Sequence, residues 1–115
     1  MTIIYKICPE ALWREAEREG VFRGTADDHR DGFIHFSTAA QLTETARKHF
    51  AGQAGLVLIS VDSDSLGPAL AWEPSRGRSS QFPHLYDELP LTAVERVVPL
   101  PLGDDGLHVI PDLAG

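Results

Sequence analysis

Residues 56–61 are the feature that most limits what this chain can fold into. They read Leu-Val-Leu-Ile-Ser-Val and are bounded by Gly55 and Asp62. A strand with one face in water alternates apolar and polar residues, whereas a run that is apolar almost throughout is typical of a strand covered on both faces. We therefore predict a fully covered, central strand over residues 56–61.

Short strand-like and helix-like segments alternate along the rest of the chain, which indicates an α+β fold. The length of 115 residues leaves room for one domain, covering residues 1–115. Further strands are predicted at residues 2–7, 32–36, 69–73, 94–100 and 107–110, the last two flanking a Gly-Asp-Asp-Gly turn as a hairpin. Loops are predicted at residues 21–31, which are polar and charged, and at residues 74–90, which carry three prolines.

Two helices are predicted, each with a recognisable boundary. The first begins at Pro9, whose fixed φ suits a first helical turn, and ends at Gly20. The second covers residues 39–50, where Thr38 and Gln41 have the spacing of a capping box and apolar residues then recur every four positions. Each helix is expected to anchor to the core.

The charge balance narrows the classes of partner. Ten Lys and Arg against seventeen Asp and Glu give a formal net charge of -7, and the ten cations are scattered from Lys6 to Arg96. A face that follows a phosphate backbone needs clustered cations. A long nucleic-acid duplex is therefore not expected as a partner.

Three further features predict a soluble protein of the cytoplasm. Cys8 is the only cysteine, so no intramolecular disulfide can form and a reducing compartment is expected. No apolar run approaches the roughly 20 residues of a membrane-spanning helix. The first six residues lack the charged start and long apolar middle of a signal peptide. We expect an unprocessed protein that does not engage a membrane.

His35 and Lys6 are polar residues inside segments that are otherwise rich in apolar residues. Ile34 and Phe36 share one face of their strand, so His35 projects from the other. It is either an acid–base or hydrogen-bonding group on the open side of a sheet, or a structural histidine bonded to a neighbouring carbonyl. Lys6 lies within the strand 2–7, and because burying an unpaired ammonium is costly, its head must reach solvent, a carboxylate or an anionic ligand.

Residues 72–86 gather many functional groups in a short stretch. One carboxylate, two guanidinium groups, an imidazole and three large aromatic rings come from Glu73, Arg76, Arg78, His84, Trp72, Phe82 and Tyr86. Pro83 biases the residue before it toward an extended conformation, which would hold His84 in a defined orientation. The segment is either a binding loop on a rigid scaffold or a structural loop whose aromatic residues fill the edge of the core.

Several sharper motifs do not occur in the sequence. It has no glycine-rich dinucleotide fingerprint, no phosphate-binding loop and no Gly-x-Ser-x-Gly elbow. The five histidines show no close ligand pairing and Cys8 has no cysteine partner, so no metal is predicted. The spacing leaves open only a metal assembled from His35, His84 and a carboxylate.

Four motifs together resemble one bacterial family. They are Ile4-Tyr5-Lys6-Ile7, Asp31-Gly32-Phe33-Ile34-His35-Phe36-Ser37-Thr38, Trp72-Glu73 and Phe82-Pro83-His84-Leu85-Tyr86. On these residues the chain resembles, over nearly its whole length, the domain-of-unknown-function family nine-fifty-two. That family is grouped with the ADP-ribosyltransferase-like fold, which includes RNA 2'-phosphotransferases and rifamycin ADP-ribosyltransferases. The resemblance implies a split, mostly antiparallel β core with small helices, and a cleft that grips NAD and breaks its nicotinamide bond.

The resemblance also implies roles for individual residues. Members of that fold place a histidine on an early strand, a Tyr or His on a second strand before a Ser or Thr, and often a later acidic residue. Lys6 stands in the first position, where it departs from the pattern. His35 followed by Ser37 resembles the second group, and Glu73 resembles the acid. His84 is included from the family motif alone.

These residue types suit the chemistry that the resemblance implies. Cleavage of the nicotinamide bond creates an oxocarbenium-like centre that a carboxylate stabilises, pyrophosphate needs cationic donors, and a flat base stacks on an aromatic ring. The expected catalytic residues are His35, Glu73 and His84. The expected ligand-binding residues are Lys6, Ser37, Trp72, Arg76, Arg78 and Tyr86.

Three functions remain open from the sequence. The first is an enzyme of the ADP-ribosyl or phosphoribosyl-transfer type that acts on NAD or a related phosphorylated nucleotide. The second, which the lysine at position 6 favours, is a non-catalytic module that senses a nucleotide or another small anionic ligand. The third is a protein-interaction domain. For the first two, Lys6, His35 and Glu73 or His84 should face one cleft.

Overall fold

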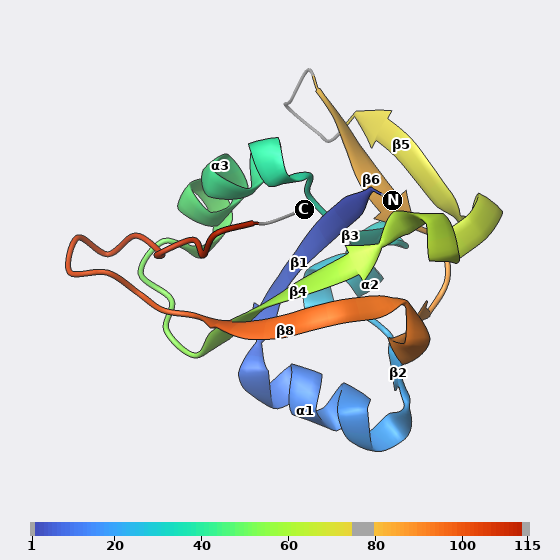
Figure 1. Ribbon diagram of the computed structural model, residues 1–115, viewed down its shortest axis with the longest axis horizontal. Helices are drawn as coiled ribbons and strands as arrows, with labels where there is room; N and C mark the ends of the chain where they lie inside the picture. Colours follow the sequence, from blue (N-terminus) through green and yellow to red (C-terminus); the bar gives the residue numbers. More distant parts are fainter. Residues whose placement is uncertain (1, 75–79, 114–115) are drawn as a thin grey trace.

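Figure 1 shows the computed structural model, which describes residues 2–74 and 80–113. In chain order the elements are β1 (Ile3–Pro9), α1 (Glu10–Glu19), β2 (Val21–Phe22), α2 (Ala26–Asp31), β3 (Ile34–His35), α3 (Ala39–Phe50), β4 (Leu56–Asp62), the 3-10 segment η1 (Ser63–Ala69), β5 (Leu70–Pro74), β6 (Gln81–Leu85), β7 (Leu89–Pro90), the 3-10 turn η2 (Leu91–Ala93) and β8 (Val94–Leu100). The α+β fold class is confirmed.

The strand predicted at residues 56–61 lies at the centre of the main sheet, as expected. β4 is the middle strand of the order β1-β4-β8 and pairs antiparallel with both neighbours. Its alternate residues enter two apolar clusters: Ile59 packs in the cluster that includes Trp13 of α1, and Leu58 packs in the one that includes Leu42 of α3. The two helices therefore cover opposite faces of the same sheet. Each large side chain buried here contributes about 1.5 to 3 kcal/mol.

Two smaller antiparallel sheets complete the fold on the α1 side of the main sheet. β6 lies between β3 and β5, and β2 pairs with β7. A single bridge joins β1 to the end of β3, with N···O distances of 2.8 and 2.9 Å between the backbones of Tyr5 and Ser37. This bridge brings Lys6 beside His35, although 29 positions in the chain separate them.

The prediction of an exposed loop at residues 21–31 is wrong. Phe22 lies in β2 and is buried, and residues 26–31 form α2. Thr25 caps this helix: its hydroxyl accepts a hydrogen bond from the backbone N–H of Asp28, and the Asp28 carboxylate accepts one from the backbone N–H of Thr25. The run of charged residues indicated exposure, but one of those carboxylates is turned into the core.

The prediction of a long loop at residues 74–90 is also wrong, because it contains β6 and β7. Three prolines favoured a loop, yet Pro83 lies within β6. Its carbonyl accepts a hydrogen bond from the backbone N–H of Phe36 at 3.0 Å, a bond that needs no donor from the proline. Residues 75–79 lie outside the described part of the chain.

The predicted C-terminal hairpin is confirmed in part. β8 forms, but residues 107–110 are not a regular strand. They return alongside residues 101–103 through an isolated bridge between Leu102 and His108 and a hydrogen bond of 2.8 Å from Val109 N–H to the carbonyl of Pro101. We call residues 101–110 the C-terminal arm.

Both predicted helices are present: α3 has the predicted bounds, and α1 begins one residue later than predicted, because Pro9 is the last residue of β1. α1 ends at Gly20, whose φ of 82° is accessible to glycine, and α3 begins after Thr38, which forms a capping box with Gln41. Within the described residues, no helix is long and apolar enough to cross a membrane.

Substituting Thr38→Ala should lower the free energy of unfolding by about 1 kcal/mol, because the N–H groups of the first turn of α3 lose their acceptor. Urea denaturation measures the change. Thr43→Ala, on the exposed side of the same helix, is the matched control and should not destabilise. Equal losses for the two variants would contradict the assigned cap.

Candidate functional site

A buried ion pair joins β1 to α2. The Nζ of Lys6 lies 2.9 Å from Oδ1 and 2.8 Å from Oδ2 of Asp28, and the two side chains are 6% and 1% exposed. Lys6 projects from β1 on the same face as Ile4 and Cys8, so it enters the cluster beneath α1 rather than reaching the surface. The sequence left solvent, a carboxylate and an anionic ligand open as surroundings of this ammonium, and the structure shows a carboxylate.

Asp28 holds several other groups besides Lys6. Its Oδ1 accepts a hydrogen bond from the backbone N–H of His35 at 3.1 Å and lies 2.6 Å from Nδ1 of the same residue, while Oδ2 accepts from the backbone of Thr25 at 2.8 Å. Burial alone would raise the pKa of Asp28. The hydrogen bond from His35 and the charge of Lys6 outweigh burial and hold the pKa of this carboxyl well below its usual range. Asp28 is therefore ionised and fixed.

His35 lies between two carboxylates. Its Nδ1 faces Asp28, and its Nε2 lies 2.9 Å from Oδ2 of Asp31. A neutral imidazole carries one N–H and can donate to only one of these oxygens at a time, whereas a protonated ring donates to both. The pair of carboxylates thus orients the ring.

A second histidine–carboxylate pair lies on the adjoining strands β5 and β6. Oε1 of Glu73 is 2.9 Å from Nδ1 of His84 and accepts a hydrogen bond of 2.7 Å from the Tyr86 hydroxyl. The Tyr86 hydrogen bond, followed by that of His84, lowers the pKa of Glu73, and the same contact raises the pKa of Tyr86. Burial lowers the pKa of His84, so its ring is neutral at pH 7 and donates its Nδ1–H to Glu73.

Phe33 connects the two pairs. Its ring stacks on that of His84, with centroids 4.0 Å apart and planes inclined by 25°. The centroids of His35 and Tyr86 lie 4.6 and 5.3 Å from it. We call the resulting group the histidine–carboxylate cluster: Lys6, Asp28, Asp31, Phe33, His35, Glu73, His84 and Tyr86.

A cavity of about 380 Å³ adjoins this cluster. Phe33, Tyr86 and Asp28 belong to its lining as well as to the cluster, and the rest of the lining consists of Arg23, His29, Gly32, Ile34, Leu85, Asp87 and Glu88. Arg23 is engaged by Glu19 and Glu88 in ion pairs. Within the described residues, the lining therefore offers a ligand aromatic faces and carboxylates, and Arg23 is paired.

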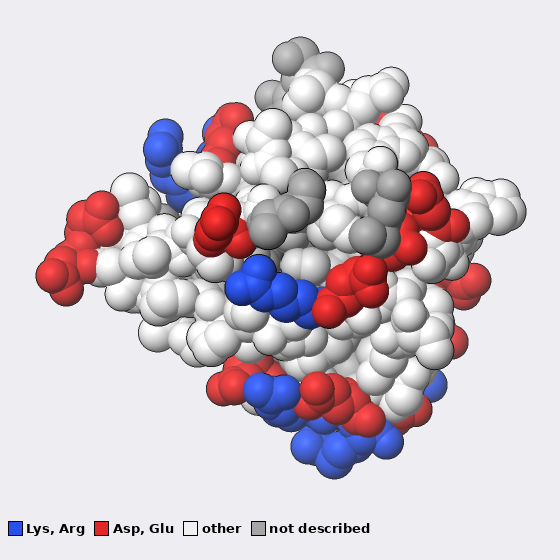
Figure 2. All heavy atoms as spheres, viewed as in Figure 1, with Lys and Arg blue, Asp and Glu red and all other residues white. Residues whose placement is uncertain are grey.

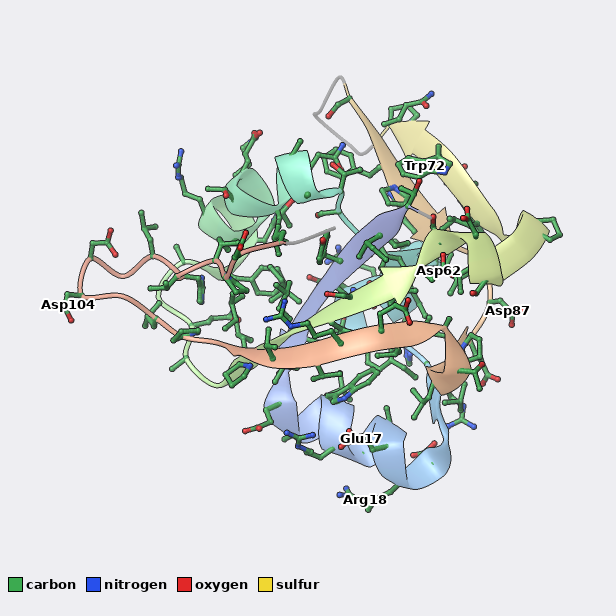
Figure 3. The ribbon with its side chains drawn as sticks, in the orientation of Figure 1. Glu17, Arg18, Asp62, Trp72, Asp87 and Asp104 are labelled. Atoms are coloured by element: carbon green, nitrogen blue, oxygen red, sulfur yellow. The ribbon has the colours of Figure 1, made fainter. Side chains whose placement is uncertain are left out.

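The structure brings together five of the residues singled out from the sequence: Lys6, His35, Glu73, His84 and Tyr86. Ser37 is buried and its hydroxyl pairs with that of Thr45 at 3.0 Å, outside the cluster. Trp72, labelled in Figure 3, is half-exposed on β5. Because neighbours in a strand face opposite ways, it projects away from Glu73. Arg76 and Arg78 lie outside the described residues.

Asp28, Asp31 and Phe33 are cluster residues for which sequence reasoning predicted no role. A signal for Asp28 was present: Thr25 followed three positions later by an acidic residue is a capping-box spacing. That pattern would have placed a helix at residues 26–31 and fixed one acid at its start.

Within residues 2–74 and 80–113, no group of three or more ligating side chains is arranged to hold a metal ion.

Substituting Asp28→Asn should lower the free energy of unfolding by about 3 to 5 kcal/mol, because the buried ammonium of Lys6 loses its counter-charge. Lys6→Met in the Asp28→Asn background should recover a large part of that loss. Urea denaturation of both single variants and the double variant gives the coupling energy. Additive losses in the double variant would contradict a direct ion pair.

Acid should weaken the fold partly through His84. Its folded pKa lies below the ordinary 6.5, so the unfolded chain binds more protons as the pH falls below that value. Stability is therefore lost from about pH 6.5 downward until the folded pKa is passed. Urea unfolding measured between about pH 7.5 and about pH 5 should show a shallower loss for His84→Gln than for the parent chain. An unchanged slope would contradict the burial effect.

Comparisons with known proteins agree with the fold. The chain is similar to protein CC0527 from Caulobacter crescentus. In the comparison with the crystal structure of that protein, the sequence identity is 48%, the TM-score is 0.89 and 94% of each chain is covered. The solution NMR structure of the same protein is 50% identical, with a TM-score of 0.83, covering 93% of this chain and 91% of that one. No match was found among curated proteins.

The profile of one family, described as "Protein of unknown function (DUF952)", matches residues 7–97. The matched range contains most of the histidine–carboxylate cluster and every strand of the two smaller sheets. The motifs that carry the resemblance in the sequence thus fall on the strands that hold the cluster. On this match, the chain belongs to the DUF952 family.

Proposed function

We propose that the chain binds NAD or a related phosphorylated nucleotide at the histidine–carboxylate cluster and cleaves the bond between its ribose and its base. The observation that carries the proposal is how the carboxylate of Glu73 is held and exposed. His84 and Tyr86 both hold Oε1, while Oε2 has no hydrogen-bond partner among the described residues and the side chain is 38% exposed. An ionised carboxylate fixed in this way stabilises positive charge that develops beside it.

The bond changes are those of glycosidic cleavage. The C–N bond to the base breaks and its electron pair stays on the nitrogen, leaving an oxocarbenium-like ribose next to Glu73. The oxygen of water or of an acceptor then bonds to that carbon and loses its proton to Glu73 or to solvent. A cationic, planar base such as nicotinamide in NAD suits the half-exposed Tyr86 ring and the carboxylates around it.

Lys6 takes a different role here from the one its position first indicated. Its ammonium is neutralised by Asp28, so we assign it to positioning Asp28 and His35 rather than to binding pyrophosphate. Arg76 and Arg78 remain the candidates for the pyrophosphate. The resemblance to ADP-ribosyltransferase-like proteins supports the choice of NAD.

A non-catalytic nucleotide sensor is the second candidate, and one observation favours it. Both nitrogens of His35 face carboxylates, which is the arrangement of a ring held in place rather than one exchanging protons with a substrate. Such a protein would bind the nucleotide and release it unchanged.

Nicotinamide release from NAD, followed by liquid chromatography with the purified chain, tests the proposal. Glu73→Gln should lower the rate by about 100-fold or more, because it removes the charge that faces the oxocarbenium. Glu17→Gln, an exposed carboxylate of α1, is the matched control and should keep the parent rate.

Calorimetric titration with NAD and ADP-ribose accompanies the assay. Binding without release would support the sensor and overturn the enzyme. Neither binding nor release would overturn both.

A further inference from the structure

The C-terminal arm carries an uncovered row of apolar side chains. It extends past the edge of the main sheet, beyond the end of β8 (Figure 1). Leu102, Leu107 and Val109 are 36%, 37% and 57% exposed, although they belong to one short segment. Apolar side chains gathered on a projecting segment are typical of an interaction surface.

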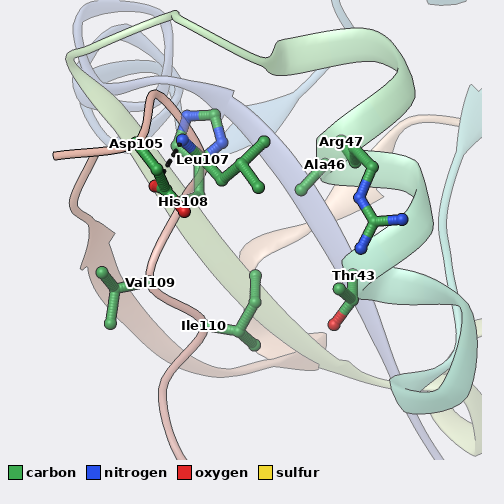
Figure 4. A pocket seen from close by; sticks show the side chains of 8 residues that line it. All are labelled: Thr43, Ala46, Arg47, Asp105, Leu107, His108, Val109 and Ile110. Atoms are coloured by element: carbon green, nitrogen blue, oxygen red, sulfur yellow. Dashed lines mark hydrogen bonds between the residues drawn. The ribbon is translucent and has the colours of Figure 1, made fainter. Parts of the chain in front are cut away.

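A groove lies between this arm and α3. It has a volume of about 220 Å³, and Figure 4 shows α3 side chains on one side and arm side chains on the other. Ala46, Leu107, Val109 and Ile110 supply apolar surface. Arg47 on the helix and Asp105 on the arm place opposite charges on its two sides. The groove thus fits an aliphatic side chain that has an acid beside it.

The charges on this face are separated in the same way. Asp104 lies at the tip of the arm (Figure 3), where Figure 2 shows acidic side chains, and Asp105 follows it in the chain. The last turn of α3 is basic. Lys48 in that turn pairs with Glu44, whereas Arg47 makes no ion pair within residues 2–74 and 80–113. The arm of another molecule would supply an aliphatic side chain for the groove and a carboxylate for Arg47.

We propose that the arm and α3 form a two-fold interface between two copies of this chain. The arms lie antiparallel, Val109 of each copy enters the groove of the other, and Asp105 of each copy faces Arg47 of the other. In a two-fold interface the same patch of each copy must contain both members of every contact. This patch contains Val109 and the groove that would receive it, and Asp105 and the Arg47 that would pair with it. The inference does not depend on the proposed function, because the arm contributes nothing to the histidine–carboxylate cluster.

Each copy would contribute one short segment and one groove of about 220 Å³, so we assign the dimer to the weak class of interfaces. We expect a dissociation constant on the order of 10 to 100 μM. Sedimentation equilibrium of the full chain over that concentration range measures it. Val109→Asp should leave only monomer, since it places a charge in the apolar groove, while Arg18→Glu on α1 is the control and should dimerise as the parent does.

Mixing two charge-reversed variants makes the test specific to contacts between molecules. Arg47→Glu and Asp105→Arg should each fail to self-associate, because each would bring like charges together across the interface. A mixture of the two should form a heterodimer, since both contacts are then between opposite charges. Circular dichroism of each variant establishes that it is folded.

Three results would overturn the proposal. They are a monomeric parent chain up to about 1 mM, self-association of Val109→Asp equal to that of the parent, or no heterodimer on mixing folded charge-reversed variants. A partner of another kind on this face would give the first of these results.

Discussion

The arrangement of the site depends on one buried ion pair, that between Lys6 and Asp28. Removing two charges from water is costly, and their attraction offsets the cost only when both are closely paired and the remaining hydrogen-bonding capacity is satisfied. Here the carboxylate accepts from Lys6, from the backbone of Thr25 and from the backbone of His35. The pair therefore fixes α2 against β1 and β3, and any other placement of α2 would leave a charge unpaired in the core.

The same pair determines the electrostatic character of the site. Because the charge of Lys6 is neutralised by Asp28, the cluster groups that remain accessible are the carboxylates of Asp31 and Glu73 and the ring of Tyr86, whereas His84 is buried. An acidic, aromatic surface favours a cationic planar group over a phosphate. With Asp28 as its partner, Lys6 offers no free cation to a ligand at the cluster.

The central sheet separates the two regions that we assign to binding. The histidine–carboxylate cluster lies on the face shared with α1, where Lys6 leaves β1 beside Ile4 and Cys8. The C-terminal arm lies with α3 on the other face, where the residues of opposite parity in β1 and β4 are buried. Side chains that alternate along two strands therefore support both regions, and the proposed self-association through the arm would leave the cluster uncovered.

The sequence by itself determined the central strand at 56–61, the ends of α1 and α3, and the face from which His35 projects, because strand alternation, caps and apolar runs are local. It did not reveal α2 or β6, where a carboxylate turned inward and a proline accommodated in a sheet contradict local preference. Only the tertiary structure decided which group the ammonium of Lys6 contacts. Its partner lies 22 positions away, and a charge can be buried only where distant elements bring its counter-charge into contact.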